Sequence, residues 1–256
     1  MKLNYHRTGE GPALLILHGL FGTWENWGAQ IKMLAKEYDV IAADLRNHGE
    51  SPHAEETGYA AMAEDVLELM DHLSLEQAHI LGHSMGGKVA MQLAQAHPSR
   101  VRSLIVADIA PVNYGAHHDQ VFKGLFNVQL DGLKSRSEAD KQLAEHIEIP
   151  GVRAFLLKNL QKDQDGRFVW KMNLNGLHQG YSSISSEPPA ESPYNGPVLF
   201  IKGGDSDYLK QEHADAIRSR FPNARFKVIE GTGHWLHAEK PGAFNRIVER
   251  FLDDQA

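Results

Sequence analysis

One serine in the chain lies in a setting that suits a nucleophile. The pentapeptide Gly82-His83-Ser84-Met85-Gly86 follows an apolar run typical of a buried strand, Ala78 to Leu81, and precedes a helix-like run, Lys88 to Ala96. A G-x-S-x-G sequence between a strand and a helix predicts a sharp turn that exposes the seryl oxygen. Free N–H groups and the helix dipole at that point favour developing negative charge. The pattern therefore predicts nucleophilic catalysis by Ser84, the alternative being an ordinary glycine-rich turn.

A serine hydroxyl becomes a good nucleophile when a base takes its proton. Of the 15 histidines, His234 is the best candidate, because it follows the last predicted strand, Phe226 to Ile229, in a glycine-rich loop. His237 is the competing base three residues later. His83 flanks the serine, but adjacent residues on such a turn point apart.

The histidine in turn needs a carboxylate to orient it. Two predicted strand ends offer one. Asp108 follows the run Ser103 to Ala107, while Asp205 and Asp207 follow the run Val198 to Lys202. Spacing alone leaves all three carboxylates open as alternatives.

An oxyanion formed during acyl transfer needs two fixed N–H donors. One is expected from Met85, directly after the serine. The other is expected from the loop His18 to Gly22, where Leu20 is the first choice and Phe21 the second. We expect His18 to support this loop through hydrogen bonds.

Short apolar runs alternate with helical patterns along the chain. Runs that are apolar throughout are typical of strands buried on both faces. Helical spacing appears in the segments 62–73 and 244–252, and the segment 44–51 is taken as a hydrogen-bonded turn. The alternation predicts an α/β fold with a mostly parallel sheet, helices on both faces and chemistry at the carboxyl ends of the strands. The expected strands are Ala13 to Leu17, Val40 to Asp44, Ala78 to Leu81, Ser103 to Ala107, Val198 to Lys202 and Phe226 to Ile229.

The alternation breaks between Pro111 and Pro197. Helix-like stretches there include Asp119 to Leu130 and Ser137 to His146, with no clear buried strand. The segment exceeds what one crossover needs, so we interpret it as a helical lid rather than as ordinary crossover helices. The expected organisation is a core of residues 1–110 and 197–256 with a cap of residues 111–196.

Composition agrees with an enzyme of one α/β domain. The chain has 256 residues, of which 42% are hydrophobic, and a formal net charge of −7. This charge argues against nucleic acid as a partner. There is no cysteine, no signal-like N-terminus and no apolar run of membrane-spanning length, so the expectation is a cytoplasmic protein without a membrane partner. His234 and His237 have no nearby carboxylate to complete a metal site.

Three motifs, His18-Gly19, Gly82 to Gly86 and Gly233-His234, resemble in this order those of α/β-hydrolases over residues 12–110 and 197–256. More narrowly, the chain resembles the YbfF-type bacterial esterases. The stretches that carry this resemblance are His18 to Gly22, Arg46 to Gly49, Gly82 to Lys88, Asp108 to Val112 and Gly233 to Pro241.

The resemblance implies that Asp108 is the acid and that Ser206 is a supporting fourth member. Ser206 stands three residues after Gly203, where many α/β-hydrolases carry their acid, and Asp205 and Asp207 beside it remain competitors. The family implies hydrolysis of short-chain esters and acyl thioesters without a metal or organic cofactor. The expected partner is a small-molecule acyl ester or thioester, and nothing in the sequence indicates an oligomeric state.

Two other functions are compatible with these residues. A C–C bond hydrolase or lyase would use the same triad, with Arg153 and Lys158 as a charged pair in the lid. A non-catalytic binding protein would keep the fold and the pocket, because fold alone does not imply activity.

Overall fold

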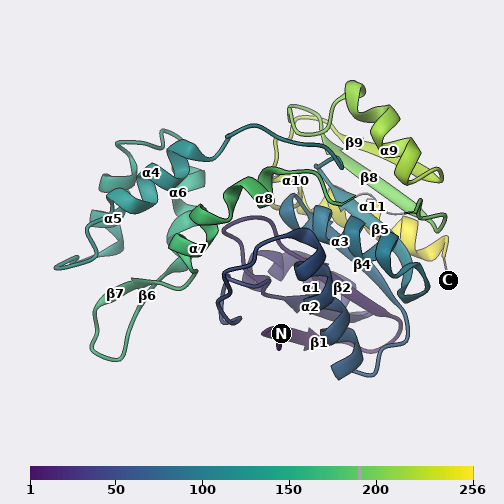
Figure 1. Cartoon of the computed structure of the whole chain (residues 1–256), viewed down its shortest axis with the longest axis horizontal. Coiled ribbons are helices and arrows are strands. Elements are labelled where there is room, and N and C mark those ends of the chain that lie inside the picture. Colours follow the sequence, from purple (N-terminus) through teal and green to yellow (C-terminus); the bar gives the residue numbers. More distant parts are fainter. Residues whose placement is uncertain (190–191, 256) are drawn as a thin grey trace.

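A seven-stranded sheet forms the centre of the molecule (Figure 1). The computed structural model describes residues 1–189 and 192–255. The strands lie in the order β1-β3-β2-β4-β5-β8-β9, and neighbours are parallel except for the antiparallel pair β1 and β3. This is the mostly parallel sheet that the sequence predicted. The strands are β1 (Tyr5–Thr8), β2 (Ala13–Leu17), β3 (Asp39–Ala43), β4 (Ala78–His83), β5 (Val101–Ala107), β8 (Val198–Gly203) and β9 (Ala224–Ile229).

Helices cover both faces of the sheet, because alternate strand residues point to opposite sides. In β2, Leu15 and Leu17 join the apolar cluster beneath α2 (Tyr59–His72), α3 (Met85–Ala96) and α9 (Ala214–Arg220). Leu14 and Ile16 join the cluster beneath α1 (Gly28–Leu34), α10 (Leu236–Glu239) and α11 (Pro241–Asp253). Short 3-10 helices occupy Trp24–Trp27, Pro98–Arg100, Leu157–Asn159 and Gln211–His213. Across the described residues, no helix combines the length and apolarity that a membrane crossing needs.

A long excursion joins the neighbouring strands β5 and β8, and Figure 1 shows its helices and hairpin set to one side of the sheet. The two predicted helices are present but shorter than expected. The sequence predicted no clear buried strand in this segment, and the structure adds a short antiparallel hairpin, β6 and β7, that is only partly buried. Only three residues long each, these strands are too short for a periodic signal. The elements are α4 (Asp119–Asn127), α5 (Arg136–Leu143), α6 (Pro150–Leu156), β6 (Leu160–Lys162), β7 (Phe168–Trp170), α7 (Leu174–Gln179) and α8 (Tyr181–Ser185).

The two edge strands differ from the sequence prediction. Strand β1 was not predicted, because Tyr5-His6-Arg7-Thr8 is largely polar and only partly buried. Strand β9 was expected to be buried on both faces, but residues 225–228 are exposed to solvent. An edge strand covered on one side needs no continuous apolar run, so its sequence carries a weaker signal.

Candidate active site

A tight turn between β4 and α3 presents Ser84. Its φ of 52° and ψ of −120° lie where residues other than glycine are rare. A Cβ atom on Gly82 would lie 2.2 Å from the carbonyl oxygen of Gly86, and one on Gly86 would lie 2.4 Å from that of Leu17. The backbone contacts thus require glycine at both positions of the motif. The turn places Ser84 at the amino end of α3.

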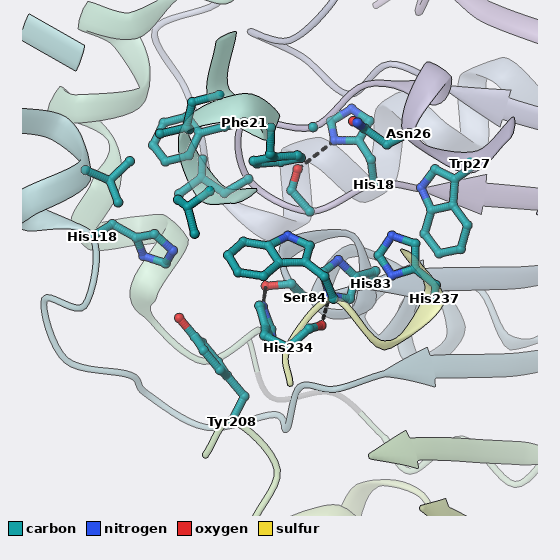
Figure 2. A pocket seen from close by; sticks show the side chains of 18 residues that line it. His18, Phe21, Asn26, Trp27, His83, Ser84, His118, Tyr208, His234 and His237 are labelled. Atoms are coloured by element: carbon teal, nitrogen blue, oxygen red, sulfur yellow. Dashed lines mark hydrogen bonds between the residues drawn. The ribbon is translucent and has the colours of Figure 1, made fainter. Parts of the chain in front are cut away.

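His234 reaches the serine from the loop after β9 (Figure 2). Its Nε2 lies 3.0 Å from Ser84 Oγ, and its Nδ1 lies 2.8 Å from Asp108 Oδ2. The three residues follow β4, β5 and β9, whose carboxyl ends share one edge of the sheet. The structure therefore brings together the predicted nucleophile, the predicted base and one of the three candidate carboxylates.

Asp108 is fully buried and hydrogen-bonded through both carboxylate oxygens. Oδ1 accepts the backbone N–H of Gly203 at 3.0 Å, and Oδ2 accepts the hydroxyl of Ser206 as well as the His234 ring. Asp205 and Asp207 are exposed to solvent instead. The surrounding donors fix the direction of the Asp108 carboxylate, and Ser206 lies where the resemblance placed it.

The other two histidines considered as bases, His237 and His83, have different surroundings. His237 stacks on Trp27 with the ring centroids 4.3 Å apart, and burial lowers its pKa to about 3. His83 donates from Nε2 to the carbonyl oxygen of His234 at 2.8 Å, and burial also lowers the pKa of His83. This bond holds the loop that carries His234, so His83 acts on the loop and not on the Ser84 proton.

Of the expected oxyanion donors, one is already occupied. The N–H of Phe21 donates to His48 Nε2 at 3.1 Å, so Phe21, the second choice, has no free amide. Within the described part of the chain, the N–H groups of Leu20 and Met85 donate to no residue. Both residues border the space in front of Ser84, so they remain our proposed pair of donors.

Hydrogen bonds made by the side chains of His18 and Asp44 hold the loop after β2. His18 Nε2 accepts the N–H of Leu45 at 2.9 Å, while its Nδ1 lies 2.8 Å from the carbonyl oxygen of Gly19. In the segment 44–51, the buried carboxylate of Asp44 accepts the backbone N–H of Trp24 at 2.9 Å. The segment is thus a hydrogen-bonded structural turn, as expected, and His18 supports the loop after β2.

A cavity of about 140 Å³ opens above Ser84 (Figure 2). Its wall is mainly apolar and comes from the sheet edge, from Trp235 and from α4 and α6 of the excursion. The residues that the excursion contributes include Val121, Val152, Phe155 and Leu156. A second, smaller cavity of about 30 Å³ also borders the serine.

Sequence reasoning missed two side chains of this site, Tyr208 and His118. The ring of Tyr208 stacks on that of His234, with centroids 3.8 Å apart and planes 20° apart. Its place two residues after Ser206 was a usable signal, whereas nothing marks His118 in the excursion. The proposed charged pair lies elsewhere, since Arg153 binds Asp140 and Lys158 is exposed.

Comparisons with known proteins agree with this geometry. The family model described as "alpha/beta hydrolase fold" matches residues 12–241. The chain is 37% identical to esterase YbfF of Escherichia coli, over 99% of this chain and all of the relative. It is 39% identical to an sn-1-specific diacylglycerol lipase of Mus musculus, over 94% of this chain and 81% of the relative. A solved structure titled "Marine microorganism esterase" superimposes with a TM-score of 0.96 at 39% identity, covering 98% of this chain and 99% of the other. The chain therefore belongs to the α/β-hydrolase family, in its YbfF-type esterase group.

Proposed function

We propose that the chain is a serine carboxylic-ester hydrolase that cleaves short acyl esters, and acyl thioesters as a second class, through an acyl-enzyme on Ser84. The observation that carries this proposal is the unbroken chain of contacts from Ser84 Oγ through the His234 ring to Asp108. A nucleophile, a base and an orienting carboxylate in this order are what acyl transfer by serine requires.

In the first half of the reaction, His234 Nε2 takes the Ser84 proton while Oγ attacks the acyl carbon. Leu20 and Met85 donate their N–H groups to the oxyanion of the tetrahedral intermediate. Asp108 stabilises the imidazolium. His234 then gives its proton to the leaving oxygen or sulfur, and the alcohol or thiol departs.

In the second half, the same ring acts on water. His234 removes a proton from a water molecule, whose oxygen attacks the acyl carbon, and then returns the proton to Ser84 Oγ. The carboxylic acid is released and the enzyme is regenerated. Each step needs only the residues already placed around Ser84.

The size of the cavity supports a small substrate. About 140 Å³ is close to the volume that holds a single benzene ring in an engineered apolar cavity. The apolar wall from α4 and α6 also supports our proposal that residues 111–196 act as a cap over a core of residues 1–110 and 197–256. In that role the cap would set the acyl preference.

Two alternatives use the same residues in other ways. A C–C bond hydrolase or lyase would use the charged pair Arg153 and Lys158 to hold a diketone-like substrate, and neither residue is among those lining the cavity. A non-catalytic binding protein would have no need for an aligned serine, histidine and acid. Relatives named as esterase and lipase also favour ester hydrolysis.

The test combines turnover with covalent labelling. Wild-type protein should release 4-nitrophenol from 4-nitrophenyl acetate in a burst, and a fluorophosphonate should label one serine. Ser84→Ala should lose both properties, while the matched control Ser206→Ala should still be labelled at Ser84. Labelling that persists in Ser84→Ala, or wild-type protein that turns over neither an ester nor a thioester, would reject the proposal.

A further inference from the structure

Ser84 borders both cavities, and among the described residues only three others do so. These are Leu20, His118 and Tyr208. Because the reacting carbonyl must sit at Ser84, a substrate with one portion in each cavity passes between these residues. The side chain of Leu20 is apolar, so His118 and Tyr208 are the polar side chains that border both cavities together with Ser84.

Tyr208 is held firmly, yet its hydroxyl is free. The ring stacks on His234, the backbone N–H donates to Ser206 Oγ at 3.2 Å, and the carbonyl oxygen accepts the hydroxyl of Tyr114. Among the described residues, the Tyr208 hydroxyl has no hydrogen-bond partner. Figure 2 shows it on the His118 side of the pocket. Burial raises the pKa of Tyr208 to about 12, so the hydroxyl stays neutral and can both donate and accept.

His118 also has one ring nitrogen without a hydrogen-bond partner among the described residues. Its Nδ1 lies 2.7 Å from the hydroxyl of Tyr181, while its Nε2 bonds to no residue in the described ranges. Burial lowers the pKa of His118 to about 4, so the ring is neutral near pH 7. Nε2 is then a donor when Tyr181 donates to Nδ1 and an acceptor in the other tautomer.

We propose that His118 and Tyr208 form a recognition site for a hydroxyl or carbonyl group that the substrate carries within a few bonds of the scissile ester. The proposal rests on the esterase function above and narrows its substrate class to short esters with a polar substituent. The physical reason is the cost of leaving these atoms unpaired. An apolar substrate displaces water from both groups and replaces none of its hydrogen bonds, whereas a polar substituent restores them.

The polar group can belong to the acyl or to the alcohol portion, and two pairs of nearly isosteric esters separate these cases. Ethyl glycolate against ethyl propionate tests the acyl side. 2-Hydroxyethyl acetate against propyl acetate tests the alcohol side. The measured quantity is the ratio of kcat/KM for the polar ester to that for its apolar partner. Dividing the wild-type ratio by the ratio of a variant cancels the intrinsic reactivity of the esters.

Tyr208→Phe keeps the ring that stacks on His234 and removes only the hydroxyl, and His118→Phe removes the ring nitrogens. Each should reduce the ratio by roughly 5- to 10-fold in one of the two pairs, as the loss of one hydrogen bond predicts. Turnover of the apolar ester should change much less. The matched control is His117→Phe, at an exposed neighbour that borders only the small cavity, and it should leave both ratios unchanged.

The outcomes separate this inference from the proposed function. If the wild-type enzyme hydrolyses the esters but both ratios are the same in Tyr208→Phe and His118→Phe, the recognition site is refuted and the esterase stands. An equal fall for polar and apolar esters would likewise refute recognition, because it would mean that the two residues only position His234. Failure of the wild type on every ester, 4-nitrophenyl acetate included, would refute the function itself.

Discussion

Replacing Ser84 by glycine should abolish activity and make the protein more stable. Ser84 occupies φ 52° and ψ −120°, a conformation that glycine adopts freely and that other residues adopt at a cost. Ser84→Ala is the matched control, because alanine loses the same hydroxyl and the same hydrogen bond to His234 but keeps the Cβ atom. The difference between the two variants therefore excludes the hydroxyl and depends on the backbone strain at the turn and on the freedom of glycine in the unfolded chain.

The size of that difference follows from two opposing contributions. A residue held in such a region costs roughly 1–3 kcal/mol of stability. Glycine removes this cost but adds roughly 0.5–1 kcal/mol through the greater freedom of its unfolded chain. The net gain of glycine over alanine should therefore be about 1 kcal/mol. For a chain of this length, that gain corresponds to roughly 2–4 °C in Tm.

Calorimetry of the two variants under identical conditions measures the difference, and urea unfolding checks it at 25 °C. Both variants should lose on the order of 1,000-fold or more in kcat. The reasoning about strain fails if Ser84→Gly melts at or below Ser84→Ala. The reasoning about chemistry fails if either variant keeps near-normal turnover.

Asp108→Asn should lower kcat on the order of 1,000- to 10,000-fold, since asparagine cannot stabilise the imidazolium, while Asp207→Asn should keep most activity. The reverse result in steady-state kinetics would assign the acid to the loop after β8. Ser206→Ala should lose roughly 10- to 100-fold, because it removes one hydrogen bond to the Asp108 carboxylate but no charge; a loss as large as that of Asp108→Asn would contradict a supporting role. His237→Phe should keep most activity, because a phenyl ring preserves the stacking in its site; collapse of kcat with an unchanged Tm would show that it takes part in proton transfer. Burial lowers the pKa of Lys88 to about 7 from 10.5. Between pH 7 and pH 10.5 the unfolded chain binds more protons than the folded chain, so Lys88 makes the free energy of unfolding rise with pH. From pH 7 to pH 9 in urea unfolding, wild type should gain on the order of 2 kcal/mol relative to Lys88→Met. Parallel pH profiles of the two proteins would refute this.

The parts of the fold that sequence predicted well are those with a strong local signal. The strands β2, β3, β4, β5 and β8 are nearly continuous apolar runs, because helices cover them on both faces. The turn at Ser84 was recognisable because close contacts with neighbouring backbone require glycine at positions 82 and 86. The edge strands and the β6–β7 hairpin lack such constraints, and their sequences do not stand out.

The choice of acid depended on strand order, which spacing along the chain does not reveal. Strand β5 lies directly beside β4, so Asp108 starts about 4.8 Å from the strand that carries Ser84. Strand β8 lies one position further out, and its loop turns Gly203 and Ser206 toward the Asp108 carboxylate. The motif resemblance supplied this assignment, and the sheet order gives its physical reason.

Backbone strain gathers at this site. Three of the residues other than glycine with positive φ are Phe21, Ser84 and Asp108. Ser84 and Asp108 directly follow β4 and β5, and Phe21 lies in the loop after the neighbouring strand β2. All three residues lie at the same edge of the sheet. The Phe21 amide donates to His48, the Ser84 hydroxyl faces His234, and the Asp108 carboxylate accepts from the His234 ring. Strain of this kind persists only where the surrounding structure holds it and gathers at functional sites. The G-x-S-x-G pattern predicted the turn at Ser84, but phenylalanine and aspartate give no local sign of positive φ, so the shared signature is visible only once the sheet has brought the three strand ends together.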